Sequence, residues 1–272
     1  MLQVRHLVKY FGGVKAVDGV SFEVRAGECV ALIGPNGAGK STCFACIAGQ
    51  HRPSGGEVLW AGQRIDALAP AQRLQRGVAR TFQVAQTFEA LTVLQNLQLL
   101  MTAGHGLPAW NVLDRVSVAA ATQLLARVGL QPLAHADALG LPYGAKKRLE
   151  LAMALAGLGE GEGEGEGEGA LADPQGRSLP PARPRLLLLD EPAAGLAEPE
   201  RLALMQLVKS LAREGVAVLY TEHNMDAVFG VADRVLVLIE GQLAAQGMPA
   251  EIARHPEVRS RYLGHSFDAE MP

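Results

Sequence analysis

A glycine-rich motif near the N-terminus has the composition of a loop that binds phosphate. Residues 34–41 read GPNGAGKS and fit the pattern GxxxxGK[ST]. In such a loop the glycines let backbone N–H groups point inward around phosphate oxygens, and Lys40 adds a mobile positive charge. The hydroxyl of Ser41 can bind Mg²⁺. We therefore predict that this loop binds a nucleotide, although the loop alone does not say what the nucleotide drives.

Two adjacent carboxylates follow a run of four leucines much further along the chain. Residues 186–189 are all leucine, and Asp190 and Glu191 come next. Such a run predicts a buried strand that delivers Asp190 to the carboxyl edge of a parallel sheet, where ligands bind. There Asp190 would hold Mg²⁺ or its waters, and Glu191 would orient or activate the water that attacks the γ-phosphate. The alternative for Glu191 is a surface carboxylate at a strand end.

A histidine follows a third predicted strand. Residues 216–220 are apolar and lead into the sequence TEHNMD, which places His223 just beyond the end of that strand. A lone histidine is more often structural than catalytic. Here, however, it would lie at the same sheet edge as the phosphate-binding loop and Asp190, which favours a catalytic role.

The elements around the loop are those that a phosphate-binding loop requires. Residues 20–24 alternate in polarity and residues 29–33 form a continuous apolar run, so both predict strands. The sequence CFACIAG after the loop suits a helix that Gly49 ends. Cys43 and Cys46 fall on this helix without a second ligand pair, so we expect them to be buried in packing.

Composition places the chain among globular proteins. It has 272 residues, of which 49% are hydrophobic and 19% charged. The 25 Lys and Arg against 28 Asp and Glu argue against a general nucleic-acid binder, which would carry a basic excess. The longest apolar runs are far shorter than the roughly 20 residues that span a bilayer. No secretory signal is evident, and three cysteines offer no disulfide framework, so we expect a cytoplasmic setting.

One segment departs from the rest of the chain. Residues 157–185 are built around the repeat EGEGEGEGEG and end in LPPARPR. Alternating Gly and Glu combine high backbone entropy with charge repulsion, and nothing apolar offsets the cost of ordering them. We therefore expect this low-complexity insertion to be disordered. Its net charge of −3 equals that of the whole chain, so the remaining residues are formally neutral.

Together the motifs resemble those of the ATP-binding subunits of ABC transporters, over nearly the whole chain. GPNGAGKST resembles the Walker A motif, LLLLDEP the Walker B motif, and His223 the switch histidine. In ARTFQ, Gln83 matches the Q-loop glutamine, and residues 141–156 (LPYGAKKRLELAMALA) resemble the signature motif with its helix. KYFGGVKAVDGVSF is similar to the family's opening strands. In it Phe11 matches the aromatic residue that stacks on adenine, and Tyr10 is the weaker candidate.

The resemblance implies one α/β P-loop NTPase domain of the ABC type. A mixed sheet core and an antiparallel β subdomain would come from residues 1–86 and 186–250. An inserted α-helical subdomain with the signature motif would span residues 87–156, followed by the insertion at 157–185. Residues 251–272 would form a short C-terminal extension.

The resemblance also implies ATP and Mg²⁺ as ligands and assigns residues to them. ATP would be bound by Phe11, Gly34, Pro35, Asn36, Gly37, Ala38, Gly39, Lys40, Ser41 and Thr42, and by Leu141 and Gly144 of the signature motif. Mg²⁺ would be bound by Ser41, Gln83 and Asp190. Catalysis would depend on Glu191, His223, Lys40 and Gln83.

The implied partners are other transporter subunits. Two ATPase subunits, identical or different, would enclose two ATP molecules, each held between one subunit's Walker A loop and the partner's signature motif. Integral-membrane permease subunits would bind the pair, a solute-binding protein would act indirectly, and no nucleic acid is involved. The chain would then lie peripherally on the cytoplasmic side of the inner (plasma) membrane.

Several phrases are similar to one subgroup, the importers of branched-chain amino acids, other hydrophobic amino acids, amides and urea. They are FGGVKAV, ARTFQ followed by FEALTVLQNL, the YG form of the signature followed by KKRLELA, EPAAGL, and the terminal RYLG. We therefore expect an ATPase that powers such an importer. The alternatives are the ATPase of a lipid or lipopolysaccharide exporter, which shares the YLG ending, and a slow-turnover nucleotide-binding partner in a heterodimer.

The signature motif departs from the family pattern. Pro142 replaces the usual serine, Tyr143 the first glycine, and Ala145 the usual Gln or Glu, while Ala197 stands where the D-loop often carries Asn, Asp or Ser. Pro142 lacks the hydroxyl and the backbone N–H that could donate to the opposing γ-phosphate. Proline is compatible with a helix's first turn, so we expect the fold to survive and closure of the ATP sandwich to weaken.

Overall fold

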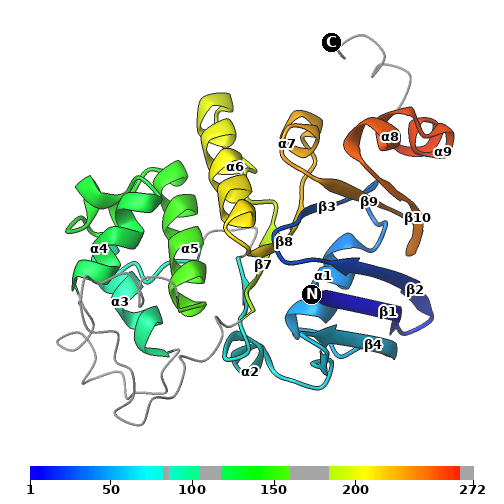
Figure 1. Ribbon diagram of the computed structural model, residues 1–272, viewed down its shortest axis with the longest axis horizontal. Coiled ribbons are helices and arrows are strands. Elements are labelled where there is room, and N and C mark those ends of the chain that lie inside the picture. Colours follow the sequence, from blue (N-terminus) through cyan, green and yellow to red (C-terminus); the bar gives the residue numbers. More distant parts are fainter. Residues whose placement is uncertain (82–85, 104–117, 160–183, 264–272) are drawn as a thin grey trace, which may run out of the picture. The chain divides into compact units, whose positions relative to one another are not determined.

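The structure is a computed structural model that describes residues 1–81, 86–103, 118–159 and 184–263 (Figure 1). Gln83 and most of the low-complexity insertion lie outside the described residues. The chain divides into two compact units. The first contains Met1–Arg73, Arg80–Val84 and Leu186–Pro272, and the second contains Leu74–Ala79 and Ala85–Arg185.

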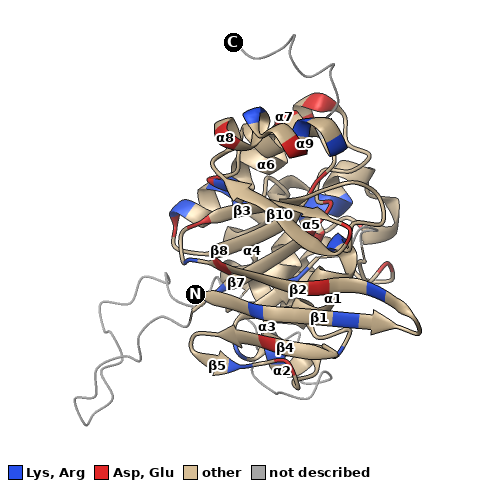
Figure 2. Cartoon of the chain, turned by 90° about the vertical axis from the view of Figure 1, so that its right-hand side faces the viewer, with Lys and Arg blue, Asp and Glu red and all other residues tan. Residues whose placement is uncertain are grey.

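An antiparallel sheet of the first unit is built from the N-terminal strands. Its order is β2-β1-β4-β5 (Figure 2). The strands are β1 (Leu2–Phe11), β2 (Val14–Val24), β4 (Gly55–Trp60) and β5 (Gln63–Arg64). In β2, Val20, Phe22 and Val24 are buried while Ser21 is exposed, which confirms the strand predicted from the alternation.

The second sheet is mixed and supplies the edge where the predicted site lies. Its order is β10-β9-β3-β8-β7-β6, with parallel pairing from β9 through β3 and β8 to β7 and antiparallel pairing of β10 with β9. The strands are β3 (Cys29–Ile33), β6 (Val78–Arg80), β7 (Leu186–Asp190), β8 (Ala217–Thr221), β9 (Arg234–Ile239) and β10 (Gln242–Gly247). Because β3, β7 and β8 are parallel, the segments that follow them leave the sheet at the same edge.

Helices cover this sheet because its central strands are apolar on both faces. Every residue of β3 and β8 is buried, as are the four leucines of β7. The helices of the first unit are α1 (Lys40–Ala48), α2 (Pro70–Leu74, at the boundary of the units), α6 (Glu198–Arg213), α7 (Met225–Phe229), α8 (Pro249–Arg254), α9 (Pro256–Val258) and η4 (Arg259–Leu263). In α6, Leu204, Val208 and Leu211 form a buried stripe at helical spacing.

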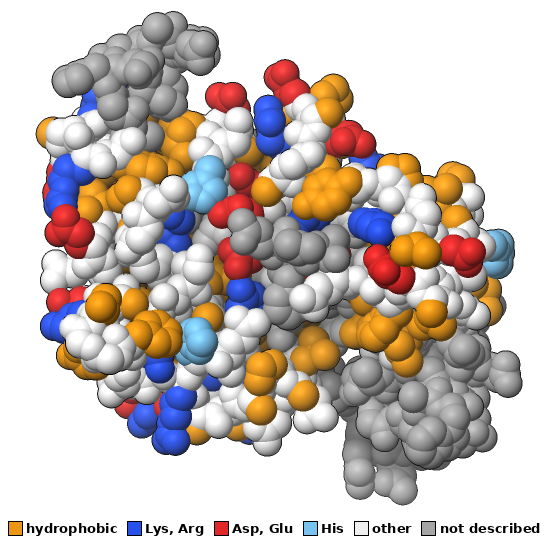
Figure 3. All heavy atoms as spheres, turned by 180° about the vertical axis from the view of Figure 1, so that it is seen from behind, with side chains coloured by type: hydrophobic (Ala, Val, Ile, Leu, Met, Phe, Trp, Pro, Cys, Tyr) orange, Lys and Arg blue, Asp and Glu red, His pale blue; other side chains and the backbone are white. Residues whose placement is uncertain are grey.

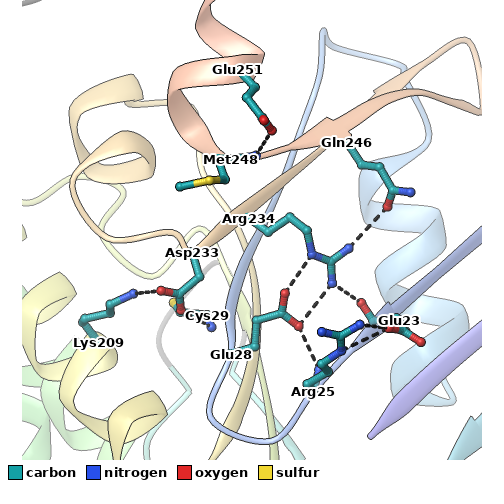
Figure 4. A network of polar contacts seen from close by, with 10 residues as sticks. All are labelled: Glu23, Arg25, Glu28, Cys29, Lys209, Asp233, Arg234, Gln246, Met248 and Glu251. Carbon is teal, nitrogen blue, oxygen red and sulfur yellow. Dashed lines mark hydrogen bonds and ion pairs between the residues drawn. The ribbon is translucent and has the colours of Figure 1, made fainter.

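A polar network fixes the edge of the sheet opposite the predicted site (Figure 4). Arg234, the first residue of β9, donates to the carboxylate of Glu28 at 2.7 Å and to the carbonyl oxygen of Glu23 at 2.6 Å. The carboxylate of the preceding Asp233 accepts from the backbone N–H of Cys29 at 2.9 Å. These bonds fix the beginnings of β3 and β9 relative to each other. They thereby also fix which residues of the two strands lie side by side at the other end, next to the predicted site.

Charges of both signs occur on the same face of the molecule. On the face drawn in Figure 3, Lys and Arg side chains lie interspersed with Asp and Glu. Within the ranges that the structure describes, no helix has both the length and the apolar character needed to cross a bilayer.

The second unit is helical. Helices α3 (Val93–Ala103), α4 (Val118–Arg127) and α5 (Tyr143–Gly157) pack against one another, with short 3₁₀ turns at Gln131–Leu133 and Ala138–Gly140 (Figure 1). In α4, Ala121, Leu124 and Leu125 are buried at the i, i+3 and i+4 spacing of one helix face. The mixed sheet, the antiparallel sheet and the helical unit together confirm the predicted fold class.

A buried arginine ties the end of α1 to the following loop. Arg73 is 1% exposed. Its guanidinium donates to the carbonyl oxygens of Cys46 at 2.8 Å, Ile47 at 2.5 Å, Leu68 at 3.0 Å and Asp66 at 3.2 Å. Burial lowers the pKa of this side chain. The carbonyl groups of Cys46 and Ile47 belong to the last turn of α1, where backbone acceptors lack intrahelical partners. Arg73 therefore supplies hydrogen-bond donors to the carbonyl groups at the end of the helix that carries Lys40.

We expect Arg73→Met to lower the free energy of unfolding by about 3 kcal/mol, because it removes the guanidinium that donates to four carbonyl oxygens, among them that of Ile47 at the end of α1. Urea unfolding followed by circular dichroism measures the loss. Arg5→Met, on an exposed side chain of β1, is the matched control and should stay within about 0.5 kcal/mol of the wild type. Equal stability of the two variants would contradict a role for Arg73 in ending α1.

Candidate functional site

The phosphate-binding loop runs from β3 to α1 and is closely packed at two of its glycines. Gly34 has φ 147° and Gly39 has φ 95°. A β-carbon on Gly34 would lie 2.0 Å from the carbonyl oxygen of Leu238, and one on Gly39 would lie 2.2 Å from that of Ala16. Neither position has room for a side chain, so glycine is required at both by close approach of backbone.

Lys40 places a positive charge inside this loop. The side chain is 7% exposed, and its ammonium donates to the carbonyl oxygens of Gly34 at 2.6 Å and Pro35 at 3.0 Å. Burial lowers the pKa of Lys40, and the carboxylates of Glu191 and Asp190 oppose that shift. Phosphate oxygens are stronger acceptors than carbonyl oxygens, so the ammonium can exchange these partners for a phosphate.

The first turn of α1 offers its backbone to an anion. Gly39 is the residue before the helix, and no side chain caps it. The first N–H groups of a helix lack intrahelical acceptors and therefore suit phosphate oxygens. In the loop and this turn, Asn36, Gly37 and Ser41 are exposed, Thr42 is half-buried, and Ala38 is buried. The two helix cysteines, Cys43 and Cys46, are buried as predicted, and burial raises the pKa of the Cys46 thiol to about 11.

Asp190 ends β7 with both carboxylate oxygens hydrogen-bonded. Oδ1 accepts from the hydroxyl of Thr221 at 2.9 Å, and Oδ2 accepts from Nη2 of Arg80 at 2.7 Å. These two hydrogen bonds join the end of β7 to the end of β8 and to the end of β6. Sequence reasoning did not identify Arg80 or Thr221 as part of the site, although Arg80 stands in the same ARTFQ phrase as Gln83.

Glu191 and His223 meet at the edge of the sheet. Glu191 Oε1 lies 2.7 Å from His223 Nε2. The backbone N–H of Glu191 donates to both the carbonyl oxygen and the hydroxyl of Thr221, at 3.2 and 3.0 Å, and Glu191 has φ 48°. A non-glycine residue with positive φ is uncommon and is held here by these contacts. The structure thus brings together the two residues that the sequence predicted to be catalytic.

The neighbouring Glu222 fixes the segment that carries His223. It is 4% exposed, and its carboxylate accepts from the backbone N–H groups of Ala193 at 2.9 Å and His223 at 3.1 Å. Burial raises the pKa of Glu222. Asn224 then begins α7 by accepting from the N–H of Ala227 at 2.9 Å. The sequence signal for Glu222 was its place in TEHNMD, between a buried strand and the histidine.

A tyrosine from the C-terminal segment reaches the phosphate-binding loop. The backbone of Gly34 hydrogen-bonds the phenolic oxygen of Tyr262, and burial raises the pKa of that phenol. The adjacent Arg261 pairs with Glu240 at 2.5 Å and with Glu257 at 3.2 Å. Tyr262 was noted in the sequence only as part of RYLG, and the structure adds that it supports the first glycine of the loop.

The candidate adenine-stacking residue is exposed. Phe11 ends β1 with 45% of its surface accessible, and its ring meets the edge of His51 at a centroid distance of 5.2 Å. Lys9 Nζ lies 5.0 Å from the centre of the Phe11 ring. Tyr10 is equally exposed, with Lys15 Nζ 5.7 Å from its ring. Stacking of Phe11 on adenine therefore stays a prediction.

The signature residues belong to the helical unit. Pro142, with φ −55°, is the residue before α5, and no side chain caps this helix. The helix therefore begins without the usual serine, as predicted from proline's compatibility with a helix start. Leu141 and Gly144 are buried, whereas Tyr143 is 44% exposed. The contact of Leu141 and Gly144 with a partner's ATP is not tested by a single chain.

Comparison with known proteins gives the family. The model of the ABC transporter family matches residues 17–158. The branched-chain amino acid transport ATP-binding protein LivG of Salmonella typhimurium is 35% identical, and BraF of Pseudomonas aeruginosa is 34% identical. The lipopolysaccharide export ATP-binding protein LptB of Escherichia coli is 30% identical. Each alignment covers 98% of both chains.

Solved structures give the same result. A nucleotide-free ATP-binding cassette from an ABC transporter superposes with a TM-score of 0.78 at 29% identity, covering 97% of this chain and 99% of that one. The ADP conformation of an ATP-binding cassette superposes with a TM-score of 0.77, at the same identity and coverage. The fold is thus that of an ATP-binding cassette, and the chain belongs to the ABC transporter family.

Proposed function

We propose that this chain is the ATP-binding and ATP-hydrolysing subunit that powers an ABC importer. The observation that carries the proposal is the single sheet edge at which the phosphate-binding loop, Asp190 and the Glu191–His223 pair follow parallel strands. LivG and BraF, whose names state branched-chain amino acid transport, support an importer of branched-chain or other amino acids, or of amides or urea. LptB has a lower identity, which places lipopolysaccharide export second.

The residues present fit a magnesium ion bound together with ATP. Asp190 and Ser41 offer a carboxylate and a hydroxyl, the hard oxygen ligands that Mg²⁺ prefers, and Gln83 would add an amide oxygen. Among the described residues, no group of three or more His, Cys, Asp or Glu side chains could hold a metal alone. This suits a metal that takes most of its ligands from phosphate and water. When bound, Mg²⁺ would neutralise charge on the β- and γ-phosphates.

Hydrolysis follows from the residues at the sheet edge. Lys40 and the first-turn amides of α1 bind the phosphates. Glu191 accepts a proton from the attacking water, and His223, 2.7 Å from its Oε1, holds the carboxylate in place. The hydrogen bonds of Glu191 to Thr221 fix the backbone at the strand end, so the base is positioned before the nucleotide binds.

The same proposal includes the partners and the domain organisation. Two ATPase subunits, identical or different, enclose ATP so that Leu141 and Gly144 of one face the nucleotide of the other. Permease subunits anchor them peripherally at the cytoplasmic face of the inner membrane, with a solute-binding protein acting indirectly. The chain works as one ABC domain, with a core from residues 1–86 and 186–250 and a helical subdomain at 87–156. Residues 157–185 are an insertion, and residues 251–272 are an extension.

Solute uptake by a strain that lacks the gene tests this function. We expect uptake of radiolabelled leucine, isoleucine, valine or urea to fall to background and to return when the wild-type chain is supplied. The Glu191→Gln chain should not restore it, while Glu57→Gln, at a half-buried glutamate of β4 paired with Arg64, should. Unchanged uptake of every solute together with loss of lipopolysaccharide from the cell surface would favour the exporter instead.

A further inference from the structure

Arg80 is held on several sides at the last position of β6. Its Nη2 donates to Asp190 Oδ2 at 2.7 Å, and its Nη1 donates to the side-chain oxygen of Gln50. The guanidinium carbon lies 5.5 Å from the centre of the Phe44 ring, on the helix that follows the phosphate-binding loop. Gln83 follows Arg80 by three residues. The side chain thus links Asp190 to α1 and to the strand that leads to Gln83.

The ion pair between Arg80 and Asp190 is shielded from solvent. Each side chain is 13% exposed, so water screens their attraction less than it would at the surface. The other oxygen of Asp190 is occupied by the hydroxyl of Thr221. Both oxygens of the predicted magnesium ligand therefore already have protein donors, and the one at Oδ2 is a full positive charge.

A guanidinium and a divalent cation cannot share one carboxylate oxygen at close range without strong repulsion. The Thr221 hydroxyl is neutral and adapts by rotation, whereas the guanidinium of Arg80 carries a full positive charge. The donor that must yield when a metal approaches Asp190 is therefore Arg80. Because Arg80 is the last residue of β6, its displacement acts on the end of that strand.

We propose that Arg80 is a positioning residue that holds Asp190 through Oδ2 and is displaced when Mg²⁺ binds with ATP, which couples metal binding to the end of β6. This inference rests on the proposed function, since it requires a magnesium-dependent nucleotide site. In the absence of metal, Arg80 neutralises Asp190 beside the phosphates. In its presence, the freed guanidinium leaves the carboxylate to the ion.

The test compares nucleotide affinity with and without metal in the full chain. Binding of fluorescently labelled AMP-PNP is titrated in Mg²⁺ and in EDTA. The dissociation constant in EDTA divided by that in Mg²⁺ measures how strongly metal binding and nucleotide binding are coupled. For Arg80→Gln we expect this ratio to rise about fivefold, because nucleotide binding in EDTA weakens beside an unneutralised Asp190 while binding in Mg²⁺ no longer displaces a cation. Arg64→Gln, which removes an exposed arginine paired with Asp66 and Glu57, should leave the ratio unchanged.

The outcomes separate this inference from a purely structural role. If Arg80 only supports the fold, both dissociation constants shift together and the ratio stays constant, which overturns the proposal. If Arg80→Gln does not fold, Arg80→Lys is used instead, because it keeps the charge but loses the guanidinium geometry that holds Asp190 Oδ2. Its ratio should lie between that of the wild type and the fivefold higher value expected for Arg80→Gln, and a ratio equal to that of the wild type overturns the proposal. A wild-type chain whose nucleotide binding ignores Mg²⁺ would instead contradict the proposed function.

Discussion

Replacing Glu191 by glutamine is expected to lower the rate of ATP hydrolysis at least about a hundredfold while nucleotide binding is retained. Glutamine has nearly the same shape but cannot accept the proton of the attacking water. The contacts that position residue 191 through its backbone, at 3.0 and 3.2 Å to Thr221, do not involve the carboxylate. The variant should therefore fold normally and bind ATP without turning it over.

Phosphate release by the purified chain with its permease measures the loss, and labelled ATP retained after gel filtration measures binding. Glu57→Gln makes the same chemical change at a half-buried position of β4 and should leave turnover as in the wild type. Substantial hydrolysis by Glu191→Gln would exclude Glu191 as the base. A chain that shows no turnover even as the wild type would favour the alternative of a slow, regulatory nucleotide-binding partner.

The positions of these residues could be predicted because each follows a strand with a strong local signal. The apolar runs at residues 29–33 and 186–189 are too continuous for exposed structure, and they became β3 and β7. The third predicted strand, residues 216–220, differs from β8 by one residue at each end. Once strands of this kind are parallel, their carboxyl ends must meet, so the meeting of Glu191 and His223 follows from topology.

The partners of Asp190 could not be predicted in the same way. Arg80 lies 110 residues before Asp190, and Thr221 lies 31 residues after it. Nothing in the local pattern around any of them states that β6 and β8 flank β7, because strand order is decided by how all the elements pack. The contact of Tyr262 with Gly34 has the same origin. The sequence pattern therefore identified which residues carry the chemistry. The side chains that position these residues could be identified only from the fold.

The composition of residues 157–185 predicts how one stretch of the chain relates to the fold. The repeat within residues 157–185 predicts that this stretch contributes nothing to a core. The prediction is wrong for its first residues, because Gly157 ends α5 and Leu158 is buried, while residues 160–183 lie outside the described residues. The chain is described again from residue 184, two residues before β7 begins. The segments that build the sheet are thus complete on either side of the insertion, which is consistent with the slow growth of loop-closure entropy with length.

Gly39→Ala is expected to lower the free energy of unfolding by about 2–5 kcal/mol, the combined cost of a side chain at positive φ and of overpacking. Its β-carbon would lie 2.2 Å from the carbonyl oxygen of Ala16, so either β2 or the start of α1 must move. Because that movement displaces the first-turn amides and Lys40, the variant should also bind nucleotide more weakly.

Gly37→Ala is the matched control, because it shares the positive φ, 79° against 95°, but a β-carbon there meets no atom within 4 Å. It should cost only about 1–2 kcal/mol, the strain of the backbone conformation. Urea unfolding of the nucleotide-free chains separates the two terms, since the difference between the variants is the cost of the contact with Ala16. Equal losses would mean that β2 can move away from the new β-carbon at little cost in free energy. Glycine at position 39 would then be needed for its positive φ, and not because a side chain lacks room there.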